Sequence, residues 1–266
     1  MTTLIDGTYN SRDTGGMPLT GGGFTRHGVL YRSDALSTTT DAGLDAIAAS
    51  PIGTIVDFRT ESERAEAPNR LPSQHSFRVR ELSLLEGAMT GAPAAGPSST
   101  AGGTGAPDEE TMRAMLARIP TLPVLYTAML ESAATAFAEV ARVLVSPEDP
   151  DRPGVLVHCT AGKDRTGVAT ALLLDAAGAD RAAIVADYAA SERNLAGEWA
   201  ERMLARARTW GVPLVPAITD LVTATPPSAM ETALSWIDDR GGSASYLLDG
   251  GLAPAELDRL RERIAG

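Results

Sequence analysis

The sequence contains a single cysteine, and its neighbours are residue types that phosphate chemistry requires. The stretch His158–Gly167 reads HCTAGKDRTG and places Cys159 six residues before Arg165. A lone cysteine is most often a small buried apolar residue. Here it follows a short apolar strand and precedes two glycines, an arginine, a hydroxyl residue and an apolar helix. The whole string therefore predicts a reactive cysteine.

A phosphate cradle is predicted between the strand Val155–His158 and a helix over Arg165–Ala177. A helix N-terminus presents unpaired backbone N–H groups and a partial positive charge. Gly162 permits a tight curl, so the N–H groups of the loop can surround an anion. A loop of this kind is suited to binding phosphate. The residues expected to line it are Thr160, Ala161, Gly162 and Lys163.

Three side chains of this stretch have predicted chemical roles. Cys159 is the expected nucleophile, because the nest of N–H groups and the helix end favour its thiolate form. Arg165 is the expected phosphate clamp, since a planar guanidinium binds two phosphate oxygens at once. Thr166 is expected to donate a hydrogen bond to the thiolate when that thiolate leaves.

Hydrolysis of a phosphate ester also needs a general acid for the leaving oxygen. No Trp-Pro-Asp stretch lies upstream of Cys159, so Asp164 inside the loop is the first candidate and Asp57, at a strand end, the second. Each has a structural alternative. Asp164 can bond neighbouring N–H groups, and the favoured interpretation of Asp57 is that it fixes an arginine, either Arg59 or Arg12.

The basic side chains are almost all arginine. Among the 23 Lys and Arg residues only Lys163 is a lysine, and it lies four residues after Cys159. Lys163 either binds a second phosphate or acidic substrate, or is a solvated loop lysine. His158 is expected to brace the loop rather than act as a base. Tyr126 is a candidate for stacking on an aromatic substrate, although a packed helix position is favoured.

The composition excludes several classes of protein. A net charge of -11 disfavours nucleic-acid binding and broad attraction to anionic membranes. One cysteine excludes an internal disulfide and disfavours a cysteine-based zinc site, so we expect no metal and no cofactor. Apolar runs are too short to span a bilayer. The first residues contain no basic segment followed by a long apolar stretch, so we expect no secretory signal. These features favour the cytoplasm, with signal-independent export left open.

The apolar pattern predicts an α/β fold. Short strands are expected at 28–33, 53–59, 77–84 and 155–158. A helix is expected at 41–48 with Asp41 as its N-cap, and a long helix at 122–145. Further helices are expected at 109–118, 165–177, 181–191, 195–209, 215–224, 229–240 and 254–264. This order indicates a small, mostly parallel sheet with helices on both faces and a helical C-terminal third.

We expect a single domain over residues 1–266, because the length fits one large domain and no internal repeat is present. Residues 87–107 carry no charge and consist mostly of Gly, Ala, Pro, Ser and Thr. This composition predicts a flexible insertion that interrupts the domain without dividing it.

The string His158-Cys159-x-x-Gly162-x-x-Arg165-Thr166-Gly167 resembles the signature loop of cysteine-dependent protein tyrosine phosphatases. With Lys163 and Asp164 it is most similar to the atypical bacterial enzymes that resemble mycobacterial protein tyrosine phosphatase B. The resemblance continues through Asn10-x-Arg12-Asp13-x-Gly15-Gly16, Leu30–Asp34, Ile55–Arg59, Asp187-Tyr188 and Ala229–Gly250. Two positions depart from the family pattern, Ser11 and Gly241, where the family has aromatic residues.

The resemblance implies a phosphatase of phosphotyrosine, with a phosphorylated protein or phosphoinositide as partner. It also implies a phosphocysteine intermediate, Asp164 as the acid, and a helical lid at 193–225. Asp57 and Arg12 are candidate phosphate-site residues, and Asn10 and Asp13 either line the site or form a turn. Alternatives are a phosphoinositide-preferring lipid phosphatase, a phospho-ligand binding module without turnover, and a sulfur transferase. The sequence leaves phosphoserine/threonine activity and the oligomeric state open.

Overall fold

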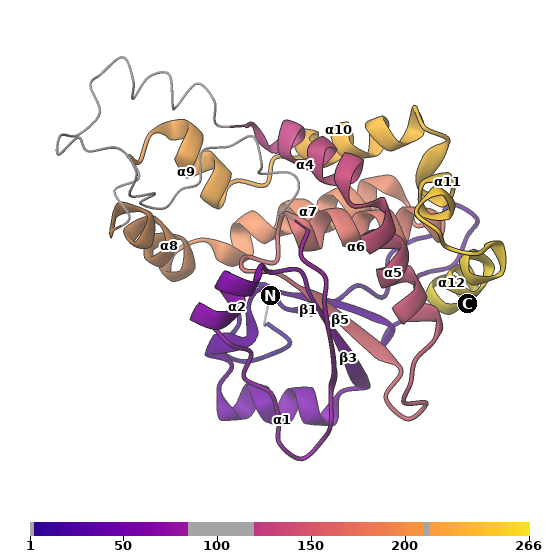
Figure 1. Ribbon diagram of the computed structural model, residues 1–266, viewed down its shortest axis with the longest axis horizontal. Coiled ribbons are helices and arrows are strands. Elements are labelled where there is room, and N and C mark those ends of the chain that lie inside the picture. The colour runs from indigo at the N-terminus through magenta and orange to yellow at the C-terminus, as the bar shows by residue number, and fades with distance from the viewer. Residues whose placement is uncertain (1–2, 85–119, 210–212) are drawn as a thin grey trace.

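A five-stranded sheet lies at the centre of the computed structural model, which describes residues 3–84, 120–209 and 213–266 (Figure 1). The strands lie in the order β1-β2-β5-β3-β4, and only the β1–β2 pair is antiparallel. The prediction of a small, mostly parallel sheet is therefore confirmed. The strands are β1 Arg12–Asp13, β2 Leu30–Ser33, β3 Ile52–Asp57, β4 Arg78–Glu81 and β5 Gly154–His158.

Helices cover both faces of this sheet (Figure 1). The first part of the chain contributes the short 3-10 helix η1 Leu36–Thr38, α1 Asp41–Ala49 and α2 Glu61–Glu66. The middle contributes α4 Leu122–Ser132, α5 Ala134–Val145, α6 Arg165–Ala176 and α7 Arg181–Leu195. The last part contributes α8 Glu198–Thr209, α9 Pro216–Thr223, α10 Pro227–Asp238, α11 Gly242–Asp249 and α12 Pro254–Ala265.

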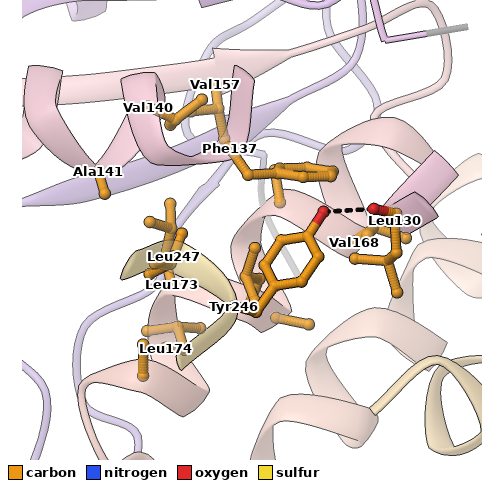
Figure 2. Packing of buried hydrophobic residues seen from close by; sticks show 14 of the residues in the cluster. Leu130, Phe137, Val140, Ala141, Val157, Val168, Leu173, Leu174, Tyr246 and Leu247 are labelled. Carbon is orange, nitrogen blue, oxygen red and sulfur yellow. Dashed lines mark hydrogen bonds between the residues drawn. The ribbon is translucent and has the colours of Figure 1, made fainter. Parts of the chain in front are cut away.

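The apolar core has two parts, one on each face of the sheet. The smaller part packs α1 through Ile47 against β3 and β5. The larger part joins β5 to α5, α6 and α11, where Phe137, Leu173 and Tyr246 lie together (Figure 2). Burial of apolar surface on this scale is the main force that holds the layers together.

Helix α6 lies inside the larger part of the core. Every residue of it except Asp175 is buried, as its nearly uniform apolar sequence predicts. The parallel strands also end at one edge of the sheet, because His158 is in register with both Ser33 and Asp57. The segments that follow β2, β3 and β5 therefore meet where α6 begins.

Several predicted elements differ from the observed ones. The long helix expected at 122–145 is two helices, because Ala133 leaves helical geometry between α4 and α5. The N-cap of α1 is Thr40, whose side chain accepts a hydrogen bond from Gly43 N, and Asp41 is the first helical residue. The expected insertion at 87–107 and helix at 109–118 lie outside the described residues. Within the described ranges, no helix is both long and apolar enough to cross a bilayer.

Candidate active site

The loop between β5 and α6 is held from behind by two polar side chains. Asn10 Nδ2 donates to the carbonyl oxygens of Ala161 and Gly162 at 3.2 and 3.0 Å. Arg32 Nη2 donates to the same Gly162 oxygen at 2.7 Å. Both side chains are buried, so the loop has a fixed outer side. The carbonyl groups of Ala161 and Gly162 are bound on that side.

Gly162 makes this curl possible. Its φ is +66°, in the left-handed region that side chains disfavour. A Cβ at this position would lie 2.3 Å from the carbonyl oxygen of Ser33, at the end of β2. Glycine is therefore required both for the turn and for the close approach of the loop to the neighbouring strand.

Cys159 lies at the base of the loop and is 1% exposed. Its Sγ accepts a hydrogen bond from Gly162 N at 3.2 Å, so a backbone N–H points at the sulfur. His158 beneath it is completely buried, and this burial lowers its pKa to about 4, so the ring is neutral at neutral pH. Thr166 Oγ1 is buried without a hydrogen-bond partner in the described part of the chain.

Arg165, the first residue of α6, is paired with Glu63 of α2. Arg165 Nη1 and Nη2 each donate a hydrogen bond to one carboxylate oxygen of Glu63, both at 2.7 Å. Burial raises the pKa of Glu63, but the hydrogen bonds and charge of Arg165 outweigh it and lower that pKa to about 2. Thr160 also donates its hydroxyl to Glu63. The predicted phosphate clamp is therefore oriented by a carboxylate from another element.

Lys163 and Asp164 lie next to each other on the side of the loop that faces α9. Lys163 is 1% exposed, and its Nζ donates to Asp164 Oδ1 at 3.0 Å and to the carbonyls of Leu221 and Ala224. Tyr126 from α4 donates to the same Oδ1 at 2.7 Å. The Asp164 side chain is 21% exposed, so one carboxyl oxygen is held while the group still reaches solvent.

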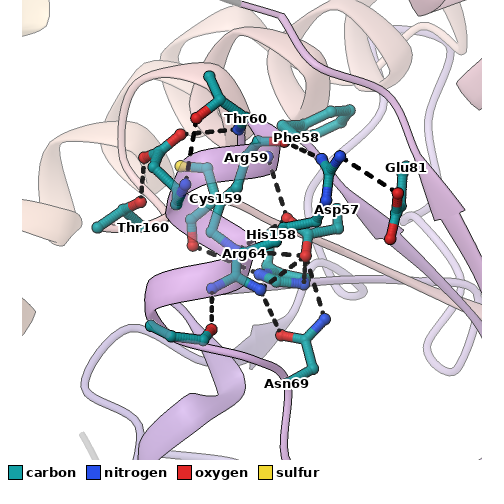
Figure 3. Close-up of polar contacts among 12 residues, drawn as sticks. Asp57, Phe58, Arg59, Thr60, Arg64, Asn69, Glu81, His158, Cys159 and Thr160 are labelled. Carbon is teal, nitrogen blue, oxygen red and sulfur yellow. Dashed lines mark hydrogen bonds and ion pairs between the residues drawn. The ribbon is translucent and has the colours of Figure 1, made fainter.

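The other two candidate phosphate-site residues are bound elsewhere. Asp57 is fully buried and accepts hydrogen bonds from Arg59, from Nε to Oδ1 at 2.9 Å and from Nη2 to Oδ2 at 2.7 Å (Figure 3). Burial raises the pKa of Asp57, but the hydrogen bonds of Arg59 more than offset this, so the pKa is lowered. Arg12 binds Asp187 at 2.6 Å. Among the described residues, neither Asp57 nor Arg12 makes a hydrogen bond to residues 159–164.

Arg12 acts on the loop indirectly. Its Nη1 donates to Asn10 Oδ1 at 2.6 Å, and Asn10 in turn holds the loop carbonyls. Arg32 shares the Asp187 carboxylate with Arg12, which ties both arginines to α7. The predicted N-terminal motif thus supports the loop from outside.

Helices α8 and α9 pack against the loop. A small apolar cluster contains Ala161, Leu195 and Trp199, with Met203 and Val222 against it. We call this cluster, together with the hydrogen bonds from Lys163 Nζ to the two carbonyls at the end of α9, the lid contact. Outside it, Arg206 of α8 pairs with Glu66 of α2. The predicted lid segment therefore touches both the loop and α2.

The parallel strand, cysteine loop and arginine-led helix have the construction of a phosphate-handling α/β hydrolase. A model of the tyrosine phosphatase family matches residues 3–266. A tyrosine-protein phosphatase of Nostoc commune is 33% identical over 171 residues, 64% of this chain and 50% of that protein. The chain belongs to the tyrosine phosphatase family, whose members hydrolyse phosphoric monoesters.

Two further relatives match over longer spans. The triple specificity protein phosphatase PtpB of Mycobacterium tuberculosis is 30% identical over 282 residues, 98% of each chain. A putative tyrosine-protein phosphatase of Cupriavidus necator is 31% identical over 249 residues, 92% of this chain and 82% of that protein. The likeness to PtpB agrees with the family resemblance of the signature loop.

Sequence reasoning assigned no role to Glu63 or Arg32. Glu63 carries a signal nevertheless: Thr60 and Glu63 form a capping box at the start of α2, directly after β3. That pattern predicts a helix start near the sheet edge where the loop lies. It does not predict that the same carboxylate pairs with Arg165, because the two residues are 102 positions apart.

Proposed function

We propose that this protein hydrolyses phosphotyrosine monoesters through a phosphocysteine intermediate, without a metal or cofactor. The observation that carries the proposal is Cys159 at the base of a loop in which Asn10 and Arg32 hold the carbonyls of Ala161 and Gly162, and the Gly162 N–H points at Sγ. Backbone N–H groups and the start of α6 favour a dianionic phosphate there. A phosphorylated protein is the proposed partner.

In the first step, the Cys159 thiolate attacks phosphorus and the bond from phosphorus to the phenolic oxygen breaks. Asp164 gives its proton to that oxygen, so tyrosine leaves as a neutral phenol. Arg165 binds two phosphoryl oxygens through the guanidinium edge that includes Nε. Nε makes no hydrogen bond to any described residue. Nη1 and Nη2 bind Glu63, and the 3.4 Å contact of Nη2 with Thr160 Oγ1 is the one that a phosphoryl oxygen would replace.

In the second step, the Asp164 carboxylate takes a proton from water, and the resulting hydroxide attacks the phosphocysteine. The sulfur–phosphorus bond breaks, inorganic phosphate forms, and the thiolate is regenerated. The buried hydroxyl of Thr166 supplies a donor for that thiolate. The cycle balances as ester plus water giving phenol plus phosphate.

Asp164 is a better proposed acid than Asp57. Asp57 is fully buried and bonded by Arg59 at both oxygens, which favours its carboxylate form permanently. Asp164 is part of the loop itself and its side chain remains partly exposed. Residues Thr160 to Lys163 contribute backbone N–H groups to the phosphate, while Asp57 and Arg12 support the loop from outside the phosphate site.

We also propose that the lid segment, residues 193–225 of a single phosphatase domain, opens to admit substrate. In the described arrangement the lid contact covers Ala161 and engages Lys163. Lys163 can bind a second anionic group of a substrate, such as a phosphoinositide, only after α9 releases it. Substrate breadth is thus coupled to lid opening.

Cys159→Ser tests the mechanism. Turnover of p-nitrophenyl phosphate is expected to fall by at least about 10³-fold, because the hydroxyl is a far weaker nucleophile than the thiolate. Binding of inorganic phosphate, followed by calorimetry, should survive because the N–H cradle is unchanged. A phosphocysteine should be trapped by rapid acid quench in the unsubstituted protein only. Full activity in the variant would overturn the mechanism.

A phosphate-release panel separates the substrate classes. Phosphotyrosine peptides are expected to exceed phosphoserine peptides and phosphoinositides in kcat/KM. Preference for phosphoinositides would favour a lipid phosphatase. Phosphate binding without turnover of any ester would indicate a phospho-ligand binding module. Sulfur transfer from thiosulfate without phosphate release would indicate a sulfur transferase.

A further inference from the structure

A chain of buried hydroxyl groups leads from the core to Asp164. Tyr188 of α7 and Tyr126 of α4 have their phenolic oxygens 2.8 Å apart. Tyr126 donates to Asp164 Oδ1 at 2.7 Å. The two rings are 1% and 0% exposed and meet edge to face, with centroids 5.9 Å apart. Three elements that are distant in the sequence thus converge on one carboxyl group.

The direction of each hydrogen bond follows from simple chemistry. Burial, followed by the negative charge of Asp164, raises the pKa of Tyr126 well above its usual value, so Tyr126 stays a phenol. Its one proton goes to Asp164, because a carboxylate can only accept. The hydrogen bond between the two tyrosines must therefore be donated by Tyr188. The hydroxyl of Tyr126 thus accepts a hydrogen bond from Tyr188 and donates one to Asp164.

This arrangement treats the two oxygens of Asp164 differently. Oδ1 accepts from Tyr126 and also from Lys163 Nζ at 3.0 Å. Oδ2 makes no hydrogen bond to any residue within the described ranges. A proton on the carboxyl group would displace a donor if it sat on Oδ1, and displaces nothing on Oδ2. The donors can keep their hydrogen bonds to Oδ1 in both protonation states of the acid.

We propose that Tyr126 is a positioning residue of the reaction: held by Tyr188, its hydroxyl fixes Oδ1 of Asp164 and thereby assigns the transferred proton to Oδ2. The inference rests on the proposed role of Asp164 as general acid. Tyr126 itself touches no reacting atom in this scheme. Its ring fills the core, and its hydroxyl sets which carboxyl oxygen turns toward the leaving group.

Tyr126→Phe keeps the ring and removes the hydroxyl. We expect kcat/KM for phosphotyrosine or phenyl phosphate to fall about tenfold or more, a part of the roughly 10²–10⁴ that general acid catalysis contributes. Activated esters such as p-nitrophenyl phosphate need little protonation, so their turnover should change about twofold or less. Inhibition by inorganic phosphate should remain unchanged. The rate of Tyr126→Phe should therefore depend more steeply on the pKa of the leaving group than the rate of the unsubstituted protein does.

Tyr246→Phe is the matched control. Tyr246 is another buried tyrosine, and its hydroxyl donates to the carbonyl of Leu130 at 2.6 Å, with no hydrogen bond to the loop (Figure 2). Its loss removes the same chemical group from the core, so it reproduces any general cost in stability. The leaving-group dependence of this variant should equal that of the unsubstituted protein. If Tyr126→Phe behaves like Tyr246→Phe, the proposal is wrong.

Asp164→Asn separates this inference from the proposed function. It should steepen the leaving-group dependence more than Tyr126→Phe, and the double variant should show no further effect. If the leaving-group dependence of Asp164→Asn equals that of the unsubstituted protein, Asp164 is not the acid. If Asp164→Asn steepens this dependence but Tyr126→Phe has no effect, or the two effects add in the double variant, only the role of Tyr126 is wrong. If Tyr126→Phe does not fold, Tyr188→Phe provides a milder test in the same direction.

Discussion

The cations around the cysteine loop pair with carboxylates, although Arg12 and Arg32 share one of them, Asp187. Arg165 meets Glu63, Lys163 meets Asp164, and Arg12 binds Asp187. An acidic protein of net charge -11 therefore does not present a strongly positive pocket to its substrate. In the proposed mechanism, the local attraction for phosphate comes from backbone N–H groups and the start of α6, together with Arg165 Nε, which bonds no described residue.

Glu63→Gln tests the value of one of these pairs. The amide retains the shape but loses the charge and one acceptor, so Arg165 is held less firmly. We expect affinity for inorganic phosphate and kcat/KM to fall about tenfold, equivalent to about 1.4 kcal/mol. Inhibition assays with phosphate measure the first quantity and steady-state kinetics the second.

The control for that variant is Glu61→Gln, on the first turn of the same helix. Glu61 is exposed, so its substitution changes the charge of α2 without altering Arg165. Unchanged kinetics in Glu61→Gln together with a loss in Glu63→Gln would support the pairing. Equal effects of both substitutions would show that only the general charge of α2 matters.

Among the helices and strands, the sequence pattern predicts those whose formation depends on neighbouring residues. The strand at 155–158 and the helix that begins at Arg165 follow from β-branched runs and an apolar helix. The break at Ala133 does not, since no Pro or Gly marks it. There α4 turns to pack on α10, while α5 packs on α11 and α12. Those tertiary contacts are invisible in a sequence window.

The same limit applies to the candidate site. Spacing predicts Cys159 and Arg165 as members of one loop. The partners that orient the loop residues, Glu63 and Tyr126, come from other elements and are brought there only by the fold. Asp57 binds Arg59, one of the two arginines that its favoured interpretation named, and the two residues are only two positions apart. Arg12 binds Asp187, 175 positions away, and no spacing rule specifies that pair.

Lys163→Met tests the lid at this scale. The substitution removes the ammonium that binds the carbonyls of Leu221 and Ala224 at the C-terminal end of α9. Loss of these hydrogen bonds is worth about 1–3 kcal/mol, so hydrogen exchange in α9 should accelerate about tenfold or more. Mass-spectrometric exchange over 216–223 measures this.

Arg208→Met serves as the comparison for the lid experiment. Arg208 is an exposed arginine of α8, so its removal deletes a positive charge from the lid without touching the loop. Exchange in α9 should remain at the rate of the unsubstituted protein. Equal rates in all three proteins would contradict the view that Lys163 holds the lid closed.

For the whole molecule, buried groups make the free energy of unfolding depend on pH in opposed ways. Burial lowers the pKa of His158 from 6.5 to about 4, so stability is lost as pH falls through this range. Burial raises the pKa of Asp34 from 3.8 to about 6, so stability is gained as pH falls through that range. These two effects largely cancel.

Glu63 changes the free energy of unfolding mainly at lower pH than His158 and Asp34 do. Its pKa is lowered from 4.5 to about 2, so the stability that its carboxylate contributes disappears as pH falls from 4.5 toward 2. Urea denaturation should therefore give a nearly constant free energy of unfolding from pH 6.5 to about 4.5 and a decline below. Glu63→Gln should make that decline shallower. A steep loss that begins at pH 6.5 would contradict this balance.

Lys163 offers one more consequence, which concerns covalent modification. It is the only lysine in this sequence, so lysine acetylation, or side-chain attachment of an amine-reactive reagent, has a single target. That target is 1% exposed and enclosed by two carbonyls and a carboxylate. An acyl group can be added only after α9 lifts, and it then removes the charge that draws α9 back. An acylated Lys163 would therefore show that α9 had moved away from the loop, and the loss of its charge would keep α9 in that open position.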